Sequence, residues 1–223
     1  MASFDAFASN YKQLVTENVR ITGEPSEYFA AYKAAYIARR IAPPGGSRIL
    51  DYGCGVGLLS EHLKEVLHGA QIDGFDVSKE SVERIDENLL NQGTFTANLD
   101  ELGHSYDVVV LSNVLHHVSP TDREKLILES ASRLLLSGKL VIFEHNPMNP
   151  LTRWAVSQCP FDEDAILLPS GESRRYFRGG LRLMWRDYIV FFPRWLAWLR
   201  PLEPGFQWCP LGAQYAVVAE RRS

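Results

Sequence analysis

The sequence predicts a doubly wound α/β fold: a mostly parallel sheet of seven strands with helices on both faces and an antiparallel pair of strands at its C-terminal end. Short apolar segments that suit buried strands alternate with segments whose apolar residues recur every three or four positions. A glycine-rich loop joins the first strand to the next helix. Two further strand-like segments close the chain, and alternation of this kind indicates a parallel sheet.

The first helix, the first strand and the glycine loop follow each other directly. Residues 26–41 carry apolar side chains at helical spacing, with Ser26 as the expected N-cap and a Pro-Pro-Gly-Gly stop at 43–46. The short apolar segment 48–53 predicts a strand. After the loop, leucines and a valine recur at helical spacing over 58–69, which predicts a helix.

The alternation then continues to the middle of the chain. Apolar runs predict strands, Ser119-Pro120 provides an N-cap followed by proline at the first helical position, and Ser137-Gly138 provides a turn. The expected strands are 71–77, 94–99, 106–115 and 139–145, and the expected helices are 79–92 and 119–136.

Beyond residue 146 the pattern loosens. Residues 146–180 include four prolines and charges of both signs, and this segment is too long for a simple connection. Residues 188–193 and 213–220 then resemble two final strands, with a short helix between them. We therefore expect one domain made of four parts: an N-terminal helical cap (1–44), a core (45–145), a lid (146–187) and closing strands (188–223).

Composition limits the classes of function. A chain of 223 residues with 46% hydrophobic residues suits a single domain, and a net charge of −4 argues against a nucleic-acid partner. The three cysteines are widely spaced and form no C-x-x-C pair, so we expect no disulfide framework and no metal. The chain starts without a basic and apolar leader and has no run of about 20 apolar residues, which predicts a cytoplasmic protein.

The strongest motif places an acid before alternating glycines. Asp51 ends the first strand, and Gly53, Gly55 and Gly57 follow it, so the backbone can approach a ligand closely. A dinucleotide loop would read G-x-G-x-x-G, but position 58 is Leu. The carboxylate of Asp51 would repel a pyrophosphate and attract an ammonium group. A tight turn without a ligand is the alternative reading of the glycines.

With this motif the sequence resembles the class I S-adenosylmethionine-dependent methyltransferases, which have a Rossmann-like fold. The resemblance covers residues 45–145 and implies S-adenosylmethionine as cofactor and S-adenosylhomocysteine as product. Asp76 stands where a carboxylate would accept the ribose hydroxyls, although it could instead cap a helix. Asn98 stands in place of the commoner aspartate near the adenine. The implied cofactor-binding residues are Tyr11, Asp51, Gly53, Cys54, Gly55, Gly57, Asp76, Val77, Asn98, Leu99, Asn113 and Val114.

The end of the fifth strand carries the candidate catalytic residue. Ligands of parallel α/β sheets lie at the carboxyl ends of the strands, so His145 is the candidate base that removes a proton from the acceptor. Its alternative is a structural histidine held by Glu144. His116 and His117 also invite a catalytic interpretation, but a histidine pair at a strand exit is more often structural.

The acceptor side is less well defined. The lid offers Arg153, Trp154, Asp162 and Asp164 as acceptor contacts or as solvated surface, and the N-terminal helices offer Tyr28, Phe29 and Lys33, for which packing is the simpler role. Residues 181–200 interleave arginines with tryptophans, which suits a membrane interface but also ordinary packing.

These observations favour methyl transfer to an oxygen or nitrogen of a small molecule or of a lipid-linked precursor. C-methylation of a quinone-like precursor and a non-catalytic S-adenosylmethionine-binding module are the alternatives. A nicotinamide-dependent oxidoreductase is disfavoured by Leu58 and by the absence of a Tyr-x-x-x-Lys pair. Nothing in the sequence indicates the oligomeric state.

Overall fold

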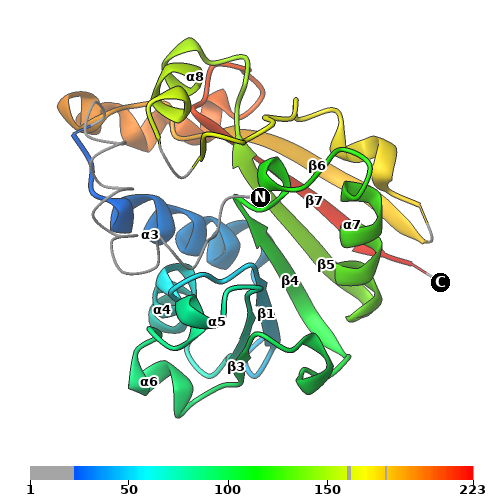
Figure 1. Cartoon of the computed structure of the whole chain (residues 1–223). Coiled ribbons are helices and arrows are strands. Elements are labelled where there is room, and N and C mark those ends of the chain that lie inside the picture. Colours follow the sequence, from blue (N-terminus) through cyan, green and yellow to red (C-terminus); the bar gives the residue numbers. More distant parts are fainter. Residues whose placement is uncertain (1–22, 160–161, 179, 223) are drawn as a thin grey trace.

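The computed structural model describes residues 23–159, 162–178 and 180–222. Seven strands form one sheet in the order β3-β2-β1-β4-β5-β7-β6 (Figure 1). Strands β1 to β5 are parallel to one another, whereas β7 is antiparallel to both β5 and β6. This confirms the predicted fold class. The strands are β1 (Arg48–Tyr52), β2 (Gln71–Phe75), β3 (Phe95–Thr96), β4 (Tyr106–Ser112), β5 (Leu134–His145), β6 (Leu181–Ile189) and β7 (Gln214–Arg221).

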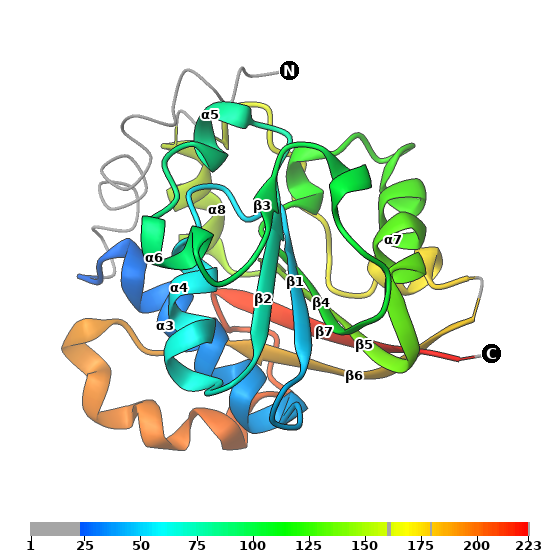
Figure 2. The same ribbon diagram turned by 90° about the horizontal axis from the view of Figure 1, so that it is seen from below.

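Helices cover both faces of this sheet. Figure 2 shows α3 and α4 on one side of the strands and α7 on the other. The α-helices are α3 (Ser26–Tyr36), α4 (Leu58–Val66), α5 (Lys79–Val82), α6 (Glu87–Leu90), α7 (Arg123–Ser132) and α8 (Pro150–Ser157). A π-helical turn, η3 (Ile37–Ile41), follows α3, and the 3-10 helices are η4 (Leu99–Glu101), η5 (Leu115–His117), η7 (Ser173–Tyr176) and η8 (Arg194–Phe206).

Strand β4 lies at the centre of the core and divides it. Val108 and Val110 pack with α3 and α4 on one face, whereas Val109 and Leu111 pack with α7 on the other. Alternate residues of a strand point to opposite faces, so the run of apolar residues in β4 supplies both halves of the core. Burial on both faces explains why this strand is continuously apolar in sequence.

Several helix boundaries differ from the prediction. The expected helix at 79–92 is two short helices, because Asp86 accepts the backbone N–H of Asn88 and begins α6 anew. Helix α7 begins at Arg123 rather than after Ser119, whose carbonyl closes a turn instead. Ser26 is the first residue of α3 and Pro25 is its N-cap, so Ser26 is not the cap.

The C-terminal strands are longer and differently placed than expected. Strand β6 begins at Leu181, so residues 181–187, predicted as part of the lid, pair with β7 instead. We therefore use "lid" for residues 146–180 from here on. The expected strand at 188–193 overlaps only the end of β6. Among the described helices, none combines the length and the apolar character that crossing a membrane requires.

Candidate active site

A cavity of about 410 Å³ lies at the carboxyl ends of β1, β4 and β5, within the range of small-molecule sites. Besides the ends of β4 and β5, its walls include the glycine loop after β1, helix α3, the lid with α8, and the segment after β6. Of the predicted site residues, those in the cavity wall are Asp51, Gly53, Cys54, Gly55, Asn113 and His145.

The glycine loop has a backbone path that side chains would block. Gly53 has a φ of +86°, and a Cβ there would lie 2.4 Å from Cγ2 of Val114. Gly55 has a φ of +53°, and a Cβ there would meet nothing within 4 Å. The N–H groups of Gly53 and Cys54 both donate to the carbonyl of Phe75, which fixes the loop to β2. The loop is therefore rigid, with open space over Gly55 for a ligand to approach the backbone.

Asp51 places a carboxylate with one unused oxygen in this cavity. Its side chain is fully buried, and the hydroxyl of Ser60 donates to Oδ2 at 2.7 Å. Among the described residues Oδ1 has no hydrogen-bond partner. Burial raises the pKa of Asp51 to about 6, so the group is mostly ionised at neutral pH. A buried carboxylate oxygen of this kind requires a donor, and the ammonium group of S-adenosylmethionine fits that requirement.

Lys33 places a buried amine close to this carboxylate. It extends from α3 into the cavity wall, and its Nζ donates to Oγ of Ser112 at 2.9 Å. Burial lowers the pKa of Lys33 to about 8, although Glu144 and Asp51 partly offset the shift. Tyr28 and Phe29 of the same helix line the cavity as well. The sequence suggested packing roles for all three, and the structure adds contact with the cavity.

Glu144 is buried and holds His116 rather than His145, its partner in the alternative interpretation of the sequence. Its Oε2 lies 2.5 Å from Nδ1 of His116, and its Oε1 accepts the backbone N–H of Leu115 at 2.6 Å. Burial opposes the charge on His116, but Glu144 and Asp162 outweigh it and raise the pKa of His116 to about 9. This carboxylate therefore fixes the orientation of the His116 ring.

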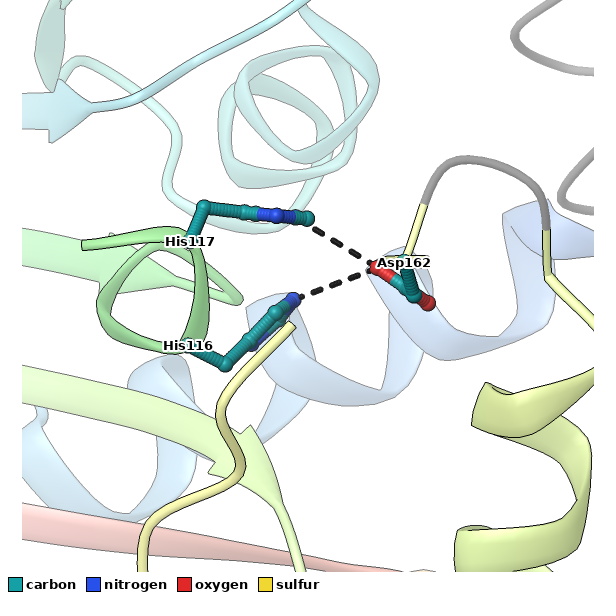
Figure 3. A group of neighbouring side chains, drawn as sticks. All are labelled: His116, His117 and Asp162. Atoms are coloured by element: carbon teal, nitrogen blue, oxygen red, sulfur yellow. Dashed lines mark ion pairs between the residues drawn. The ribbon is translucent and has the colours of Figure 1, made fainter. Parts of the chain in front are cut away.

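Asp162 of the lid meets both histidines of η5. Its Oδ1 lies 3.4 Å from Nε2 of His116 and 3.4 Å from Nε2 of His117, as Figure 3 shows. The backbone joins the same elements, because the N–H of Ile166 donates to the carbonyl of His116 at 2.8 Å. These contacts bind the lid to the end of β4.

His145 lies beside this cluster and lines the cavity. Its ring centroid is 5.2 Å from that of His116. Burial and the positive charge of His116 lower the pKa of His145 to about 4, so its imidazole is neutral at physiological pH. A neutral imidazole carries a lone pair that can accept a proton.

The other predicted cofactor residues lie outside the cavity wall. Gly57 is the N-cap of α4, and Val114 packs against the loop. Asp76 accepts the N–H groups of Gly55 and Ser78, at 2.8 and 2.9 Å, and so supports the loop. Their binding roles stay predictions, as do those of three residues at the ends of β2 and β3: Val77, Asn98 and Leu99. Tyr11 lies outside the described residues.

The contact between Asp162 and the histidines, and the part that the segment after β6 plays in the cavity wall, were not evident in the sequence. Asp162 stands 45 positions after His117 along the chain, and no motif spacing connects them. Arg153, Trp154 and Asp164, the other lid candidates, are exposed and do not line the cavity. The apolar side chains that close the cavity on the other side, Phe192 and Trp195, come from the segment after β6.

Comparison with known proteins gives one family and many similar folds. Residues 26–183 match the family model described as "Methyltransferase domain". The ubiquinone biosynthesis O-methyltransferase of Erwinia tasmaniensis is 26% identical, and the match covers 99% of this chain and 92% of that protein.

Solved structures resemble the chain in fold. The magnesium protoporphyrin IX methyltransferase of Synechocystis PCC 6803, crystallised with bound S-adenosylmethionine, has a TM-score of 0.61 at 20% identity, covering 93% of this chain and 83% of that one. An S-adenosylmethionine-dependent methyltransferase of Archaeoglobus fulgidus has a TM-score of 0.61 at 17% identity, covering 86% and 94%.

Proposed function

The chain belongs to the class I S-adenosylmethionine-dependent methyltransferases, and we propose that it methylates an oxygen of a small acceptor with an acidic hydroxyl group. The observation that carries this proposal is a cavity whose wall holds the neutral imidazole of His145 and Oδ1 of Asp51, which has no hydrogen-bond partner among the described residues. The relative from Erwinia tasmaniensis is named an O-methyltransferase, which supports oxygen as the acceptor atom.

S-Adenosylmethionine supplies a methyl group bound to a positively charged sulfur. On the donor side, Asp51 would accept a hydrogen bond from the ammonium group of the cofactor. Because Gly55 has no side chain and open space above it, the cofactor could lie against the backbone of the loop. Asn113 offers a second buried carbonyl oxygen, Oδ1, that has no partner among the described residues. The chain thus presents two hydrogen-bond acceptors to the ammonium group of the cofactor.

On the acceptor side, His145 would take the proton that the hydroxyl loses. With its pKa near 4, this histidine is a weak base. Proton transfer to a weak base is efficient only when the hydroxyl itself is acidic. The acceptor class that fits best is therefore a phenol or an enol rather than an aliphatic alcohol.

The test is a methyl-transfer assay on three acceptor classes: phenols, aliphatic alcohols and aromatic amines. We expect turnover with phenols, with the new methyl on oxygen by NMR of the product. His145→Gln should lower kcat by about 10²- to 10⁴-fold and leave the affinity for S-adenosylhomocysteine unchanged in calorimetry. His104→Ala, at an exposed histidine, is the matched control. A methyl group on carbon or nitrogen, or full activity of His145→Gln, would contradict the proposal.

We also propose that the protein contacts a membrane surface through α8 and η8, which overlaps the second half of the predicted segment 181–200. Residues 181–189 form an edge strand with a buried end, whereas the three tryptophans after it are 72–78% exposed: Trp195, Trp198 and Trp208. Exposed Leu151 and Trp195 also line the cavity, so this apolar surface reaches its opening. An amphipathic or lipid-linked acceptor could enter there.

Charge supports the same partner. Within residues 146–158 and 190–213, the exposed charged side chains are Arg153 and Arg194, and the one acid, Glu203, is buried. Tryptophans with arginines suit an anionic bilayer surface. The fraction of protein that sediments with phosphatidylglycerol vesicles should fall in the double variant Trp195→Ser/Trp198→Ser. It should not fall in Leu136→Ser, which replaces an exposed leucine on β5. Equal binding by all three proteins would contradict this contact. The cytoplasmic location stays a prediction.

A further inference from the structure

Three side chains in the cavity wall form a group with the chemistry of a metal site. Nε2 of His116, Nε2 of His117 and a carboxylate oxygen of Asp162 all lie within 4.8 Å of one another (Figure 3). We propose that this group binds a divalent transition-metal ion of the Zn²⁺ type. The sequence predicted no metal, because the cysteines have no zinc-type spacing and a histidine pair at a strand exit is more often structural.

The distances suit an ion better than direct pairing. Each histidine Nε2 lies 3.4 Å from Oδ1 of Asp162. Charge-assisted N–H···O bonds are shorter, about 2.7–2.9 Å. A tetrahedral Zn²⁺ with bonds of about 2.0–2.1 Å holds neighbouring ligand atoms about 3.3 Å apart. The two measured separations match the edges of such a tetrahedron.

The surroundings of His116 orient it as a ligand. Nδ1 of His116 lies 2.5 Å from Oε2 of the buried Glu144, whose other oxygen accepts the N–H of Leu115. A metal ion would displace the proton on Nε2 of His116, while the proton on Nδ1 stays hydrogen-bonded to Glu144, so that Nε2 binds the ion beside Asp162. A carboxylate behind a ligating histidine is a common support of metal sites, since it fixes the tautomer and strengthens the ligand.

The ligand types select the class of ion. Two imidazoles and one carboxylate favour Zn²⁺ or another first-row transition ion over Mg²⁺ and Ca²⁺, which prefer oxygen ligands. Three protein ligands leave a fourth position, and all three residues line the cavity. That fourth position is where an acceptor oxygen or a water molecule would bind, as in catalytic zinc sites.

This site deepens the proposed function, on which its chemical role rests. A hydroxyl bound to the ion loses its proton more readily, and His145 lines the same cavity, where it can receive that proton. The hydroxyl proton passes to His145, and the oxygen forms its bond to the methyl carbon. The carbon–sulfur bond breaks, and its electron pair stays on sulfur to give S-adenosylhomocysteine. The metal ion keeps its oxidation state, because this methyl transfer requires no oxidant or reductant.

Metal binding can be measured without any acceptor. We expect calorimetry to show one Zn²⁺ per chain, and Co²⁺ to give the visible absorption of a low-coordinate ion. His117→Ala and Asp162→Asn should each weaken Zn²⁺ binding at least about tenfold. Circular dichroism checks that both variants are folded. His104→Ala, which removes an exposed histidine, should bind Zn²⁺ as the unchanged protein does.

Two results would overturn the site. One is folded protein that binds no Zn²⁺ or Co²⁺ stoichiometrically, and the other is binding that His117→Ala and Asp162→Asn leave intact. The two proposals can fail separately. Stoichiometric Zn²⁺ binding that depends on His117 supports the site even if no acceptor is methylated, whereas O-methylation by protein that binds no metal overturns the site and leaves the proposed function standing.

Discussion

The donor half and the acceptor half of the cavity are built in different ways. The donor half consists of β1, the glycine loop and β2, and its contacts join residues that are close in sequence. The hydrogen bond between Ser60 and Asp51 spans 9 positions, and the one between Gly55 and Asp76 spans 21. The acceptor half consists of the lid and the segment after β6. Here the hydrogen bond between Asn149 and Leu211 spans 62 positions. A local motif thus specifies the first half, and a few long-range contacts hold the second.

The largest expected effect comes from cutting one long-range anchor. Arg123, on α7, is almost fully buried, and it donates to the carbonyls of Leu115 and Ile166 and to the carboxylate of Glu172. Arg123→Ala removes these three bonds and takes a charged partner from Glu172, and it should lower the free energy of unfolding by about 3–5 kcal/mol. Hydrogen exchange should quicken in the lid more than in β1 and β2.

Arg178→Ala is the matched control for this experiment. Arg178 is exposed, and its contact with Glu124 at 3.4 Å is a surface ion pair. Its removal should change stability by less than about 1 kcal/mol. Uniform quickening of exchange across both halves in Arg123→Ala would show that the two halves are not held separately.

The next effect tests the donor half. Gly53→Ala places a Cβ 2.4 Å from Cγ2 of Val114 at a φ of +86°. We expect a loss of about 2–3 kcal/mol in the free energy of unfolding, by urea titration, and weaker S-adenosylmethionine binding. Adding Val114→Ala should recover part of the stability. Gly45→Ala, where a Cβ meets nothing within 4 Å, should be nearly neutral; equal losses in the two glycine variants would refute the steric argument.

A smaller effect, of opposite sign, comes from Asp51. Burial raises its pKa from 3.8 to about 6, so the ionised form destabilises the folded state once the pH exceeds these values. The full penalty corresponds to at most about 3 kcal/mol above pH 6, and it fades as the pH falls toward 3.8. Asp51→Asn should therefore raise the free energy of unfolding at pH 7.5, raise it less at pH 5, and weaken cofactor binding.

Both readouts are needed for Asp51→Asn. Denaturant unfolding at the two pH values gives the stability change, and calorimetry with S-adenosylhomocysteine gives the affinity. A variant that is less stable at pH 7.5 than at pH 5, relative to the unchanged protein, would contradict the direction of the pKa shift. The expected pattern would show that the donor half gives up stability to hold a charge for its ligand.

The smallest effect concerns the surface of the acceptor half. Trp198 is 74% exposed on η8, so Trp198→Ser should change the free energy of unfolding by less than about 0.5 kcal/mol in urea titration. A larger loss would mean that the tryptophans pack for stability, which was the preferred interpretation of the sequence.

The sequence predicted the secondary structure of the donor half, whose strand, loop and helix follow one another without interruption. Asp51, Gly53 and Gly55 of this half line the cavity, and their binding roles stay predictions. His145 also lies there, because the carboxyl ends of parallel strands meet at one edge of the sheet. The misplaced helix starts near Ser26 and Ser119 have a local cause, since capping residues compete over a few positions.

By itself, the sequence determined the strands of the sheet, their alternation with helices and the glycine loop after β1, because hydrophobic periodicity and glycine placement act over a few residues. Only the tertiary structure decided that Glu144 holds His116 and that Asp162 meets two histidines 45 and 46 positions earlier in the chain. It also decided that α8 and the segment after β6 share one cavity. Contacts of this range depend on how packed elements fold back on each other, and no local pattern in the sequence records that geometry.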